Sequence, residues 1–233
     1  MEKKTPADRR TVYRIGLITK QFTGVLFLQL AREAKVNLDD PAVKYLPELR
    51  RVQGFDAVTS QVTLQSLATH RGGLLPEPSD LSTLRGPIDA WEDSTRAALA
   101  KTRIEVPPNA DASYSNIGYG ALGLALENAT RTPFTDLVER KIVKPLGMTS
   151  TGFRPTPNML AHLAKGYGLR DGAPSSAVSD AELIGAAAIR SPTAAFSPPS
   201  MTWPSSSPSR WATDRPASCR ATCWRRTSTA TTG

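Results

Sequence analysis

The pattern of hydrophobic and polar positions divides the chain into three segments. Between residues 15 and about 190, apolar residues recur at helical spacing between turn signals, whereas residues 191–233 contain no Leu, Ile or Val. Residues 1–14 form a short segment that is rich in charged side chains. The pattern therefore predicts a charged N-terminal segment (1–14), a folded and mainly helical domain (15–190), and a tail (191–233) without a core of its own.

The first of the predicted helices covers residues 18–35. Its apolar side chains occupy most of the helix circumference, which predicts burial on all sides; they are Phe22, Val25, Leu26, Phe27, Leu28 and Leu30. A short element is expected at 43–46. Further helices are expected at 62–69 beginning near Thr63, at 87–100 with Trp91 and Leu99 as apolar contacts, at 117–128, and at 133–144 after a cap at Thr132. Pro107-Pro108-Asn109 predicts a turn.

Composition changes the interpretation of the tail. More than half of residues 191–233 are Ser, Thr or Pro, so the segment cannot bury enough aliphatic surface to offset the entropy of ordering, and disorder is expected. Three of the four tryptophans nevertheless lie there, at Trp203, Trp211 and Trp224. A shifted reading frame offers an explanation: with suitable codons for 200–204, the neighbouring frame reads Asp-Asp-Met-Ala. The encoding nucleotide sequence tests this hypothesis.

The net charge of +8 does not predict a nucleic-acid partner, because the excess lies at the two ends. Residues 15–190 are nearly neutral. No apolar run is long enough to cross a membrane, and the polar start does not resemble a signal peptide, so no membrane partner is expected and the localisation stays open. Cys219 and Cys223 lack a second pair of ligands, and no metal or cofactor is expected.

Candidate chemistry begins at residues 11–23. Acyl transfer by a serine needs a base near the hydroxyl, and a Ser-x-x-Lys spacing on a helix brings the two side chains to one face. Lys20 has this spacing to position 17, but position 17 is Leu17. Taken alone, Lys20 is more typical of a solvated lysine at the start of a helix.

Two later motifs follow in a consistent order. Residues 67–74 read Leu-Ala-Thr-His-Arg-Gly-Gly-Leu, and residues 114–120 read Tyr-Ser-Asn-Ile-Gly-Tyr-Gly. A tyrosine beside an ammonium can relay a proton, and an asparagine amide can hold a substrate carbonyl, which makes Tyr114 and Asn116 candidates for these roles. The alternative is a helix cap in which Ser115 or Asn116 binds free backbone amides.

A third stretch, residues 134–153, ends in Pro-Leu-Gly-Met-Thr-Ser-Thr-Gly-Phe, and Leu-Ala-Lys-Gly-Tyr follows at 163–167. Together these motifs resemble the penicillin-recognising serine hydrolases, the family of serine β-lactamases and D-alanyl-D-alanine carboxypeptidases. The loop at 67–74 departs from the family's Leu-x-x-His-Thr-Ser-Gly-Leu at Arg71 and Gly72. The resemblance implies catalytic roles for Lys20 and Tyr114, substrate binding by Asn116, and a small-molecule ligand: a β-lactam, a peptide or an ester.

The resemblance also implies an α+β fold that combines an antiparallel sheet with a helical domain. Since the sheet draws strands from both chain ends, we expect a mainly α fragment that is truncated at both ends and lacks most of the sheet. Family members are often periplasmic or secreted. The third family motif, Lys- or His-x-Gly, does not occur after residue 190, and Thr231-Thr232-Gly233 does not supply it.

The sequence is compatible with three functions. The first is a serine-hydrolase homologue, catalytically impaired because Leu17 replaces the nucleophile. The second is a hydrolase that uses Ser66, Ser113 or Ser115 instead. The third is a non-catalytic module that binds its ligand through Asn116. The sequence does not identify the natural substrate.

Overall fold

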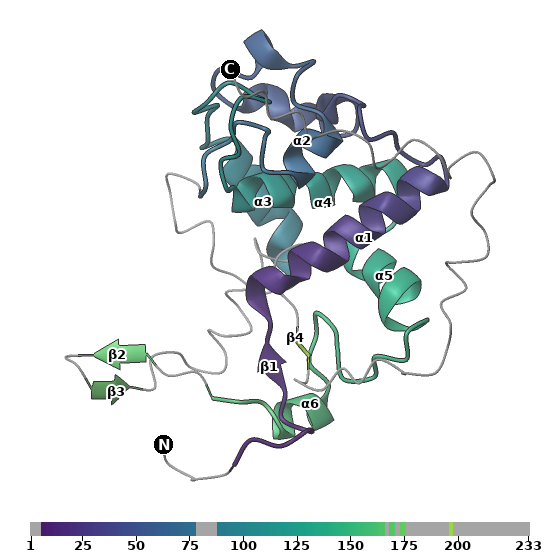
Figure 1. Ribbon diagram of the computed structural model, residues 1–233, viewed down its shortest axis with the longest axis vertical. Coiled ribbons are helices and arrows are strands. Elements are labelled where there is room, and N and C mark those ends of the chain that lie inside the picture. The colour runs from purple at the N-terminus through teal and green to yellow at the C-terminus, as the bar shows by residue number, and fades with distance from the viewer. Residues whose placement is uncertain (1–5, 78–87, 166–167, 171–172, 176–195, 198–233) are drawn as a thin grey trace, which may run out of the picture. The chain divides into compact units, whose positions relative to one another are not determined.

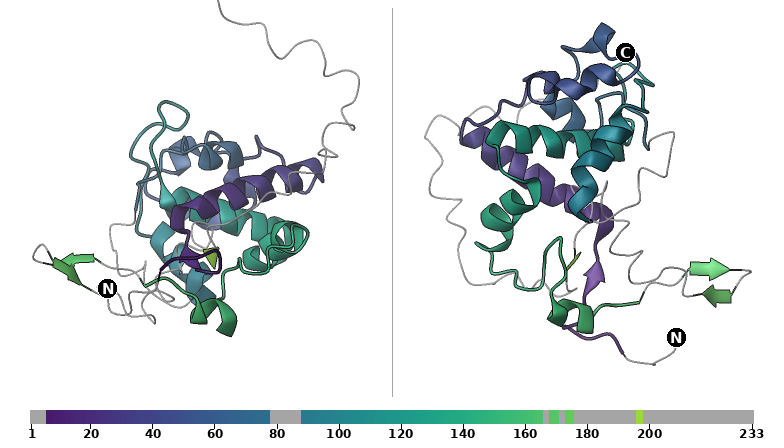
Figure 2. Two further views of the ribbon diagram at one scale, coloured as in Figure 1. Left: turned by 60° about the horizontal axis from the view of Figure 1, so that its bottom comes forward. Right: turned by 180° about the vertical axis from the view of Figure 1, so that it is seen from behind.

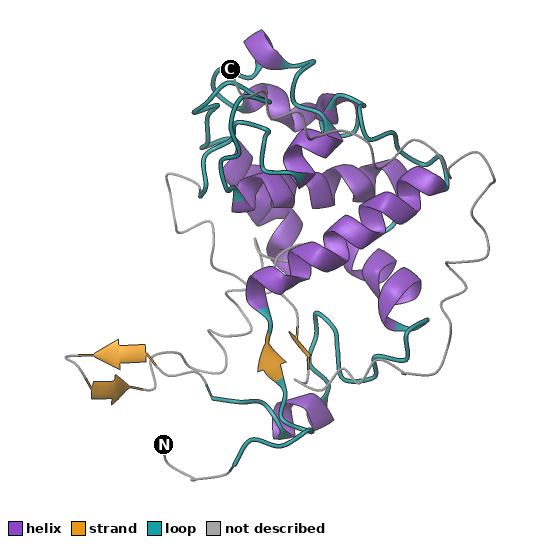
Figure 3. Ribbon diagram, in the orientation of Figure 1, coloured by secondary structure: helices purple, strands orange, loops and turns teal. Residues whose placement is uncertain are grey.

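The computed structural model describes residues 6–77, 88–165, 168–170, 173–175 and 196–197, and in these residues helices dominate (Figure 3). The α-helices are α1 (Thr19–Arg32), α2 (Leu64–Ala68), α3 (Trp91–Leu99), α4 (Asn116–Thr130), α5 (Phe134–Val138) and α6 (Pro157–Ala161). Short 3-10 helices are η1 (Gly16–Ile18), η2 (Ala42–Lys44), η3 (Pro47–Arg51), η4 (Asp56–Val58) and η6 (Ile88–Ala90), and η7 (Glu139–Val143) is a π-helical turn.

Helix α4 is the centre of the core. It packs against α1, α2, α3 and α5 (Figure 1). Its first twelve residues are all buried. Helices α4 and α2 are in direct contact: a Cβ atom added at Gly118 would lie 3.8 Å from the side chain of Leu67 in α2, an ordinary van der Waals distance. The helix predicted at 117–128 is thus confirmed, and it is two residues longer at its C-terminal end.

Helix α1 lies across α4 and also contacts α5 and η7, as the opposite views in Figures 1 and 2 show. Leu26, Phe27 and Leu30 are buried, but Val25 and Leu28 are 46% and 59% exposed. The prediction that this helix is buried on all sides is therefore wrong for the described residues, because its helical neighbours cover only one side.

The helix predicted at 62–69 is confirmed as α2, including its start. Thr63 is the N-cap residue, and Thr63 and Ser66 form a reciprocal capping box. The helix predicted at 87–100 is α3, with Trp91 and Leu99 buried as expected. The short element predicted at 43–46 is η2.

The loop after α2 is fixed by a glycine. Gly73 has a φ of +76°, and a Cβ atom there would collide with the carbonyl oxygen of Val106. The backbone carbonyl of Gly73 accepts from the N–H of Glu105 at 2.8 Å. Arg71, one of the departures from the family motif, donates to the carbonyl oxygen of Ala110 at 3.3 Å. The loop is therefore held against the segment that precedes α4.

The helix predicted at 133–144 is interrupted. It begins as α5 and continues as the π-helical turn η7, and Gly147, with a φ of +64°, follows its end. Thr132 is not the cap, because the N-cap residue is Pro133 and it makes no side-chain cap bond. The buried carboxylate of Glu127 instead accepts from the N–H of Phe134 at 2.8 Å.

Strands are short in the described residues. Strand β1 (Tyr13–Arg14) pairs antiparallel with β4 (Phe196–Ser197), and β2 (Gly168–Arg170) pairs antiparallel with β3 (Ala173–Ser175). This agrees with the expectation of a mainly α chain. Contacts group the chain into Met1–Pro199 and Ser200–Gly233. The second group lies outside the described residues, and with it most of the predicted tail. None of the described helices is long and apolar enough to span a bilayer.

Candidate functional site

Three residues singled out in the sequence meet in the structure. Lys20 is the second residue of α1 and is only 9% exposed. Its Nζ atom donates to the Tyr114 hydroxyl oxygen at 2.9 Å and to Asn116 Oδ1 at 2.6 Å. The Nζ atom also lies 4.8 Å from the centre of the Tyr114 ring, within cation–π range. The fold thus brings together residues that are 94 and 96 positions apart.

Leu17 lies in the turn η1 that leads into α1. Its side chain is 46% exposed, and Gly16 before it has a φ of +50°. Position 17 and Lys20 are three residues apart across the junction of η1 and α1, and residues at this spacing lie on one face of a helix, as the Ser-x-x-Lys pattern requires. A leucine there offers no hydroxyl to attack a carbonyl.

The Tyr-Ser-Asn motif combines a helix cap with a polar site. Ser115 is the N-cap of α4: its Oγ accepts from the N–H of Gly118 at 2.9 Å and donates to the carbonyl of Leu75 at 2.6 Å. Asn116 turns instead toward Lys20, while its backbone N–H donates to the carbonyl of Pro76 at 2.9 Å. The two sequence interpretations therefore apply to neighbouring residues and do not exclude each other.

Glu77 also belongs to the site, although no sequence motif pointed to it. Its Oε1 atom accepts from Asn116 Nδ2 at 2.5 Å. Since Asn116 Oδ1 accepts from Lys20, the amide orientation is set by a cation at one end and a carboxylate at the other. Glu77 is 39 residues away in sequence and belongs to no repeated spacing, so only the fold reveals it.

His70 also contacts the site. Its Nδ1 accepts from the N–H of Ser115 at 3.1 Å, and its ring centre lies 4.5 Å from that of Tyr114 and 5.0 Å from that of Tyr119. Burial lowers the pKa of His70, and the charge of Lys20 lowers it further. His70 belongs to the motif at residues 67–74, but the sequence gave it no role.

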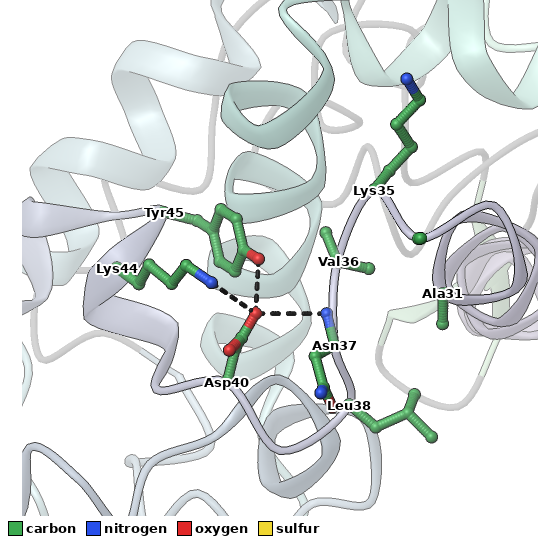
Figure 4. Close-up of a pocket in the computed structure, with 9 residues that line it drawn as sticks. Ala31, Lys35, Val36, Asn37, Leu38, Asp40, Lys44 and Tyr45 are labelled. Atoms are coloured by element: carbon green, nitrogen blue, oxygen red, sulfur yellow. Dashed lines mark hydrogen bonds and ion pairs between the residues drawn. The ribbon is translucent and has the colours of Figure 1, made fainter.

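A separate hollow of about 800 Å³ lies beyond the end of α1 and is lined by residues from Ala31 to Tyr45. In Figure 4, Lys44 and Tyr45 point toward Asp40, whereas Lys35 points away from it. Asp40 accepts from the Tyr45 hydroxyl at 2.5 Å and from Lys44 Nζ at 2.9 Å, and these bonds lower the pKa of its carboxyl group. This hollow includes none of the residues around Lys20.

The described residues contain no group of three or more His, Cys, Asp or Glu that could hold a metal ion. Cys219 and Cys223 lie outside the described residues. What gathers around Lys20 is an ammonium, a phenol, an amide, a carboxylate and an imidazole. Such a set can transfer protons and bind carbonyl groups without a metal.

Lys20, Tyr114 and Asn116, which the sequence motifs singled out, thus meet on a helical core. The Beta-lactamase family model matches residues 1–196. The chain belongs to the Beta-lactamase family.

Similar proteins agree with this assignment. The chain is 32% identical over 177 residues to protein flp of Staphylococcus aureus strain N315, covering 75% of this chain and 34% of that protein. It is 32% identical over 155 residues to the D-alanyl-D-alanine-carboxypeptidase/endopeptidase AmpH of Escherichia coli K12, covering 66% and 40%. The β-lactamase/D-alanine carboxypeptidase of Yersinia pestis superposes with a TM-score of 0.64 at 29% identity, covering 85% and 53%. The chain therefore spans about a third to a half of the length of these proteins.

Proposed function

We propose that this chain is a homologue of acyl-serine hydrolases that retains the Lys20 site but is catalytically impaired. The observation that carries the proposal is Leu17, which occupies the position three residues before a buried lysine where the family's chemistry needs a serine. Loss of a serine nucleophile typically lowers turnover by several orders of magnitude and leaves only the contribution of binding and of charge stabilisation.

The remaining residues fit a site from which only the nucleophile is missing. With a serine at position 17, the hydroxyl proton would pass, as the oxygen attacks a carbonyl carbon, to Tyr114 in its phenolate form beside the Lys20 ammonium, or to Lys20 in its neutral amine form. Asn116 would hold the substrate next to the new bond. The substrates that suit this chemistry are β-lactams, D-alanyl-D-alanine peptides and simple esters.

Two other serines are poorly placed to replace the missing nucleophile. Ser115 Oγ accepts one hydrogen bond, donates another, and is buried. Ser66 Oγ donates to the carbonyl of Thr63 and accepts from the N–H of the same residue, and it is also buried. Both hydroxyls take part in capping the start of a helix. Ser113 is half-buried and donates its backbone N–H to the carbonyl of His70.

A non-catalytic binding module is the second candidate function, and the exposure of Tyr114 favours it. Tyr114 is 45% exposed, whereas its partner Lys20 is buried, so a ligand can reach Tyr114 from solvent. A binder of this kind would take a β-lactam, peptide or ester without forming a covalent bond. Thermal stabilisation of the purified chain by benzylpenicillin, without covalent labelling, would support it.

The decisive experiment compares the chain with its Leu17→Ser and Leu17→Ala variants. We expect no hydrolysis of nitrocefin or p-nitrophenyl esters by the unchanged chain or by Leu17→Ala. Leu17→Ser should acquire slow labelling by a fluorescent penicillin, which a further Lys20→Met change should abolish. Full activity of this variant is not expected, since residues 191–233 contain no Lys- or His-x-Gly. Turnover by the unchanged chain that Ser115→Ala removes would overturn the proposal.

A further inference from the structure

His70 holds the segment that carries Tyr114 and Asn116 at two points. Its backbone carbonyl accepts from the N–H of Ser113 at 2.8 Å, and its ring Nδ1 accepts from the N–H of Ser115 at 3.1 Å. A backbone N–H can only donate, so Nδ1 must carry no proton. The contact therefore requires a neutral imidazole with its proton on Nε2.

The surroundings of the ring favour that neutral form. The ring centres of Tyr114 and Tyr119 lie 4.5 and 5.0 Å from that of His70. The Tyr119 hydroxyl donates to the carbonyl of Ala68 at 2.7 Å. The charged group that faces His70 is Lys20 of α1, and together with burial it holds the pKa of His70 below 6.5. Among the residues that the structure describes, the other titratable side chains recorded against the ring are the two phenols.

The backbone at His70 restricts what can replace it. Its φ is +59°, a left-handed conformation in which Asn, Asp and His are several-fold enriched among residues other than Gly. Asparagine also places its Oδ1 atom on Cγ, where histidine carries Nδ1. Asparagine can therefore keep both the backbone conformation and the acceptor, whereas glutamine places its oxygen one bond further out.

We propose that His70 is a positioning residue for the Lys20 site: by accepting the Ser115 N–H, its neutral ring fixes where Tyr114 and Asn116 meet Lys20. Protonation of Nδ1 removes the acceptor and places a second cation beside Lys20. Both effects loosen the segment from Ser113 to Asn116. The site is therefore assembled above the pKa of His70 and loosened below it. This inference rests on the proposed function in one respect: it assumes that the Lys20 site acts on a ligand.

The first test determines which ring nitrogen of His70 carries the proton, and it needs no ligand. The chain has two histidines, and they make opposite contacts: His162 Nδ1 lies 2.9 Å from the carbonyl oxygen of Asn158, which can only accept. Imidazole nitrogen NMR at pH 7.5 should show neutral His70 protonated on Nε2 and His162 protonated on Nδ1, with His162→Gln providing the assignment. His70 should titrate below pH 6.5. A His70 protonated on Nδ1, or one that titrates above 6.5, would overturn the proposal.

The second test compares His70→Asn with His70→Gln. Amide hydrogen exchange at Ser115 should stay within about threefold of the unchanged chain in His70→Asn and become about tenfold faster or more in His70→Gln. In the Leu17→Ser background, penicillin labelling at pH 7.5 should follow the same order. The labelling should decrease less at acid pH in the His70→Asn variant than in the chain that keeps His70, since an asparagine cannot take up a proton.

Equal exchange at Ser115 in the two variants would contradict the positioning role of His70. If Leu17→Ser takes up no penicillin at all, the proposed function fails, while nitrogen NMR and amide exchange still decide the role of His70. Equal labelling by the two variants at every pH, with different exchange at Ser115, would show that the contact holds the backbone but does not position the site.

Discussion

The Nζ atom of Lys20 lies 2.6 Å from Oδ1 of Asn116, and this contact joins the first turn of α1 to the first turn of α4. Helix N-termini carry partial positive charge, so a buried ammonium at this point is unfavourable unless acceptors compensate for it. Asn116 Oδ1 and the Tyr114 hydroxyl supply such acceptors. An arrangement that needs this compensation is typical of a functional site more than of a stabilising one.

Asn116→Ala should lower the free energy of unfolding by about 1–3 kcal/mol, because Lys20 and Glu77 each lose a buried hydrogen-bond partner. The control is Asn128→Ala on the same helix, where the exposed side chain donates to the carbonyl of Tyr45. That change should lower it by less than about 1 kcal/mol. Urea unfolding measures both. Equal losses would show that the amide of Asn116 is not specially engaged.

Ser115→Ala should lower the free energy of unfolding by about 1–2 kcal/mol, since it removes the N-cap of α4 together with the bond to the Leu75 carbonyl. Ser113→Ala, two residues earlier and not a cap, should change it by about 0.5 kcal/mol or less. Thermal unfolding of the two variants compares them. The prediction fails if Ser113→Ala is the more destabilising change.

Glu127→Gln should remove a pH dependence of stability. Burial raises the pKa of Glu127 from 4.5 to about 7, with Glu92 nearby adding to the rise and the Phe134 N–H opposing it. Between those values the folded chain holds a proton that the unfolded chain releases, so the stability from this group falls as pH rises from about 4.5 to about 7. We expect Glu127→Gln to be more stable than the unchanged chain by about 1–2 kcal/mol at pH 8 and equally stable at pH 4.

The control for this prediction is Glu139→Gln, at an exposed carboxylate paired with Lys144. It should change stability by less than about 0.5 kcal/mol at both pH values. Urea unfolding at pH 4, 6 and 8 provides the comparison. Parallel pH curves for the unchanged chain and Glu127→Gln would contradict the raised pKa of Glu127.

Leu26→Ala and Leu28→Ala test which side of α1 is covered. Leu26 is fully buried, so its truncation should lower the free energy of unfolding by about 2–5 kcal/mol. Leu28 is exposed, and its truncation should change stability by less than about 1 kcal/mol. A large loss at Leu28 would show that another surface covers this side of the helix in solution.

The sequence predicted the helical core and three site positions, because both depend on local patterns. Helical spacing placed α2, α3 and α4, and the family motifs pointed to Lys20, Tyr114 and Asn116. The sequence did not predict Glu77 or a role for His70, since their importance comes from contacts with residues about 40 positions away. Periodicity also overestimated the burial of α1, because it reports how apolar a helix is and not which neighbours cover it.

The π-helical turn η7 has a consequence for how this chain aligns with its relatives. A π turn closes i→i+5 hydrogen bonds, so it takes up one more residue than an α turn while the residues on either side keep their facing. The segment from Phe134 to Pro145 is thus one residue longer in sequence than a regular helix that would fill the same space. A relative with an unbroken α-helix here should align with a single-residue gap within Glu139–Val143, and deleting one of these residues should straighten the helix without rotating Gly147 and the residues after it.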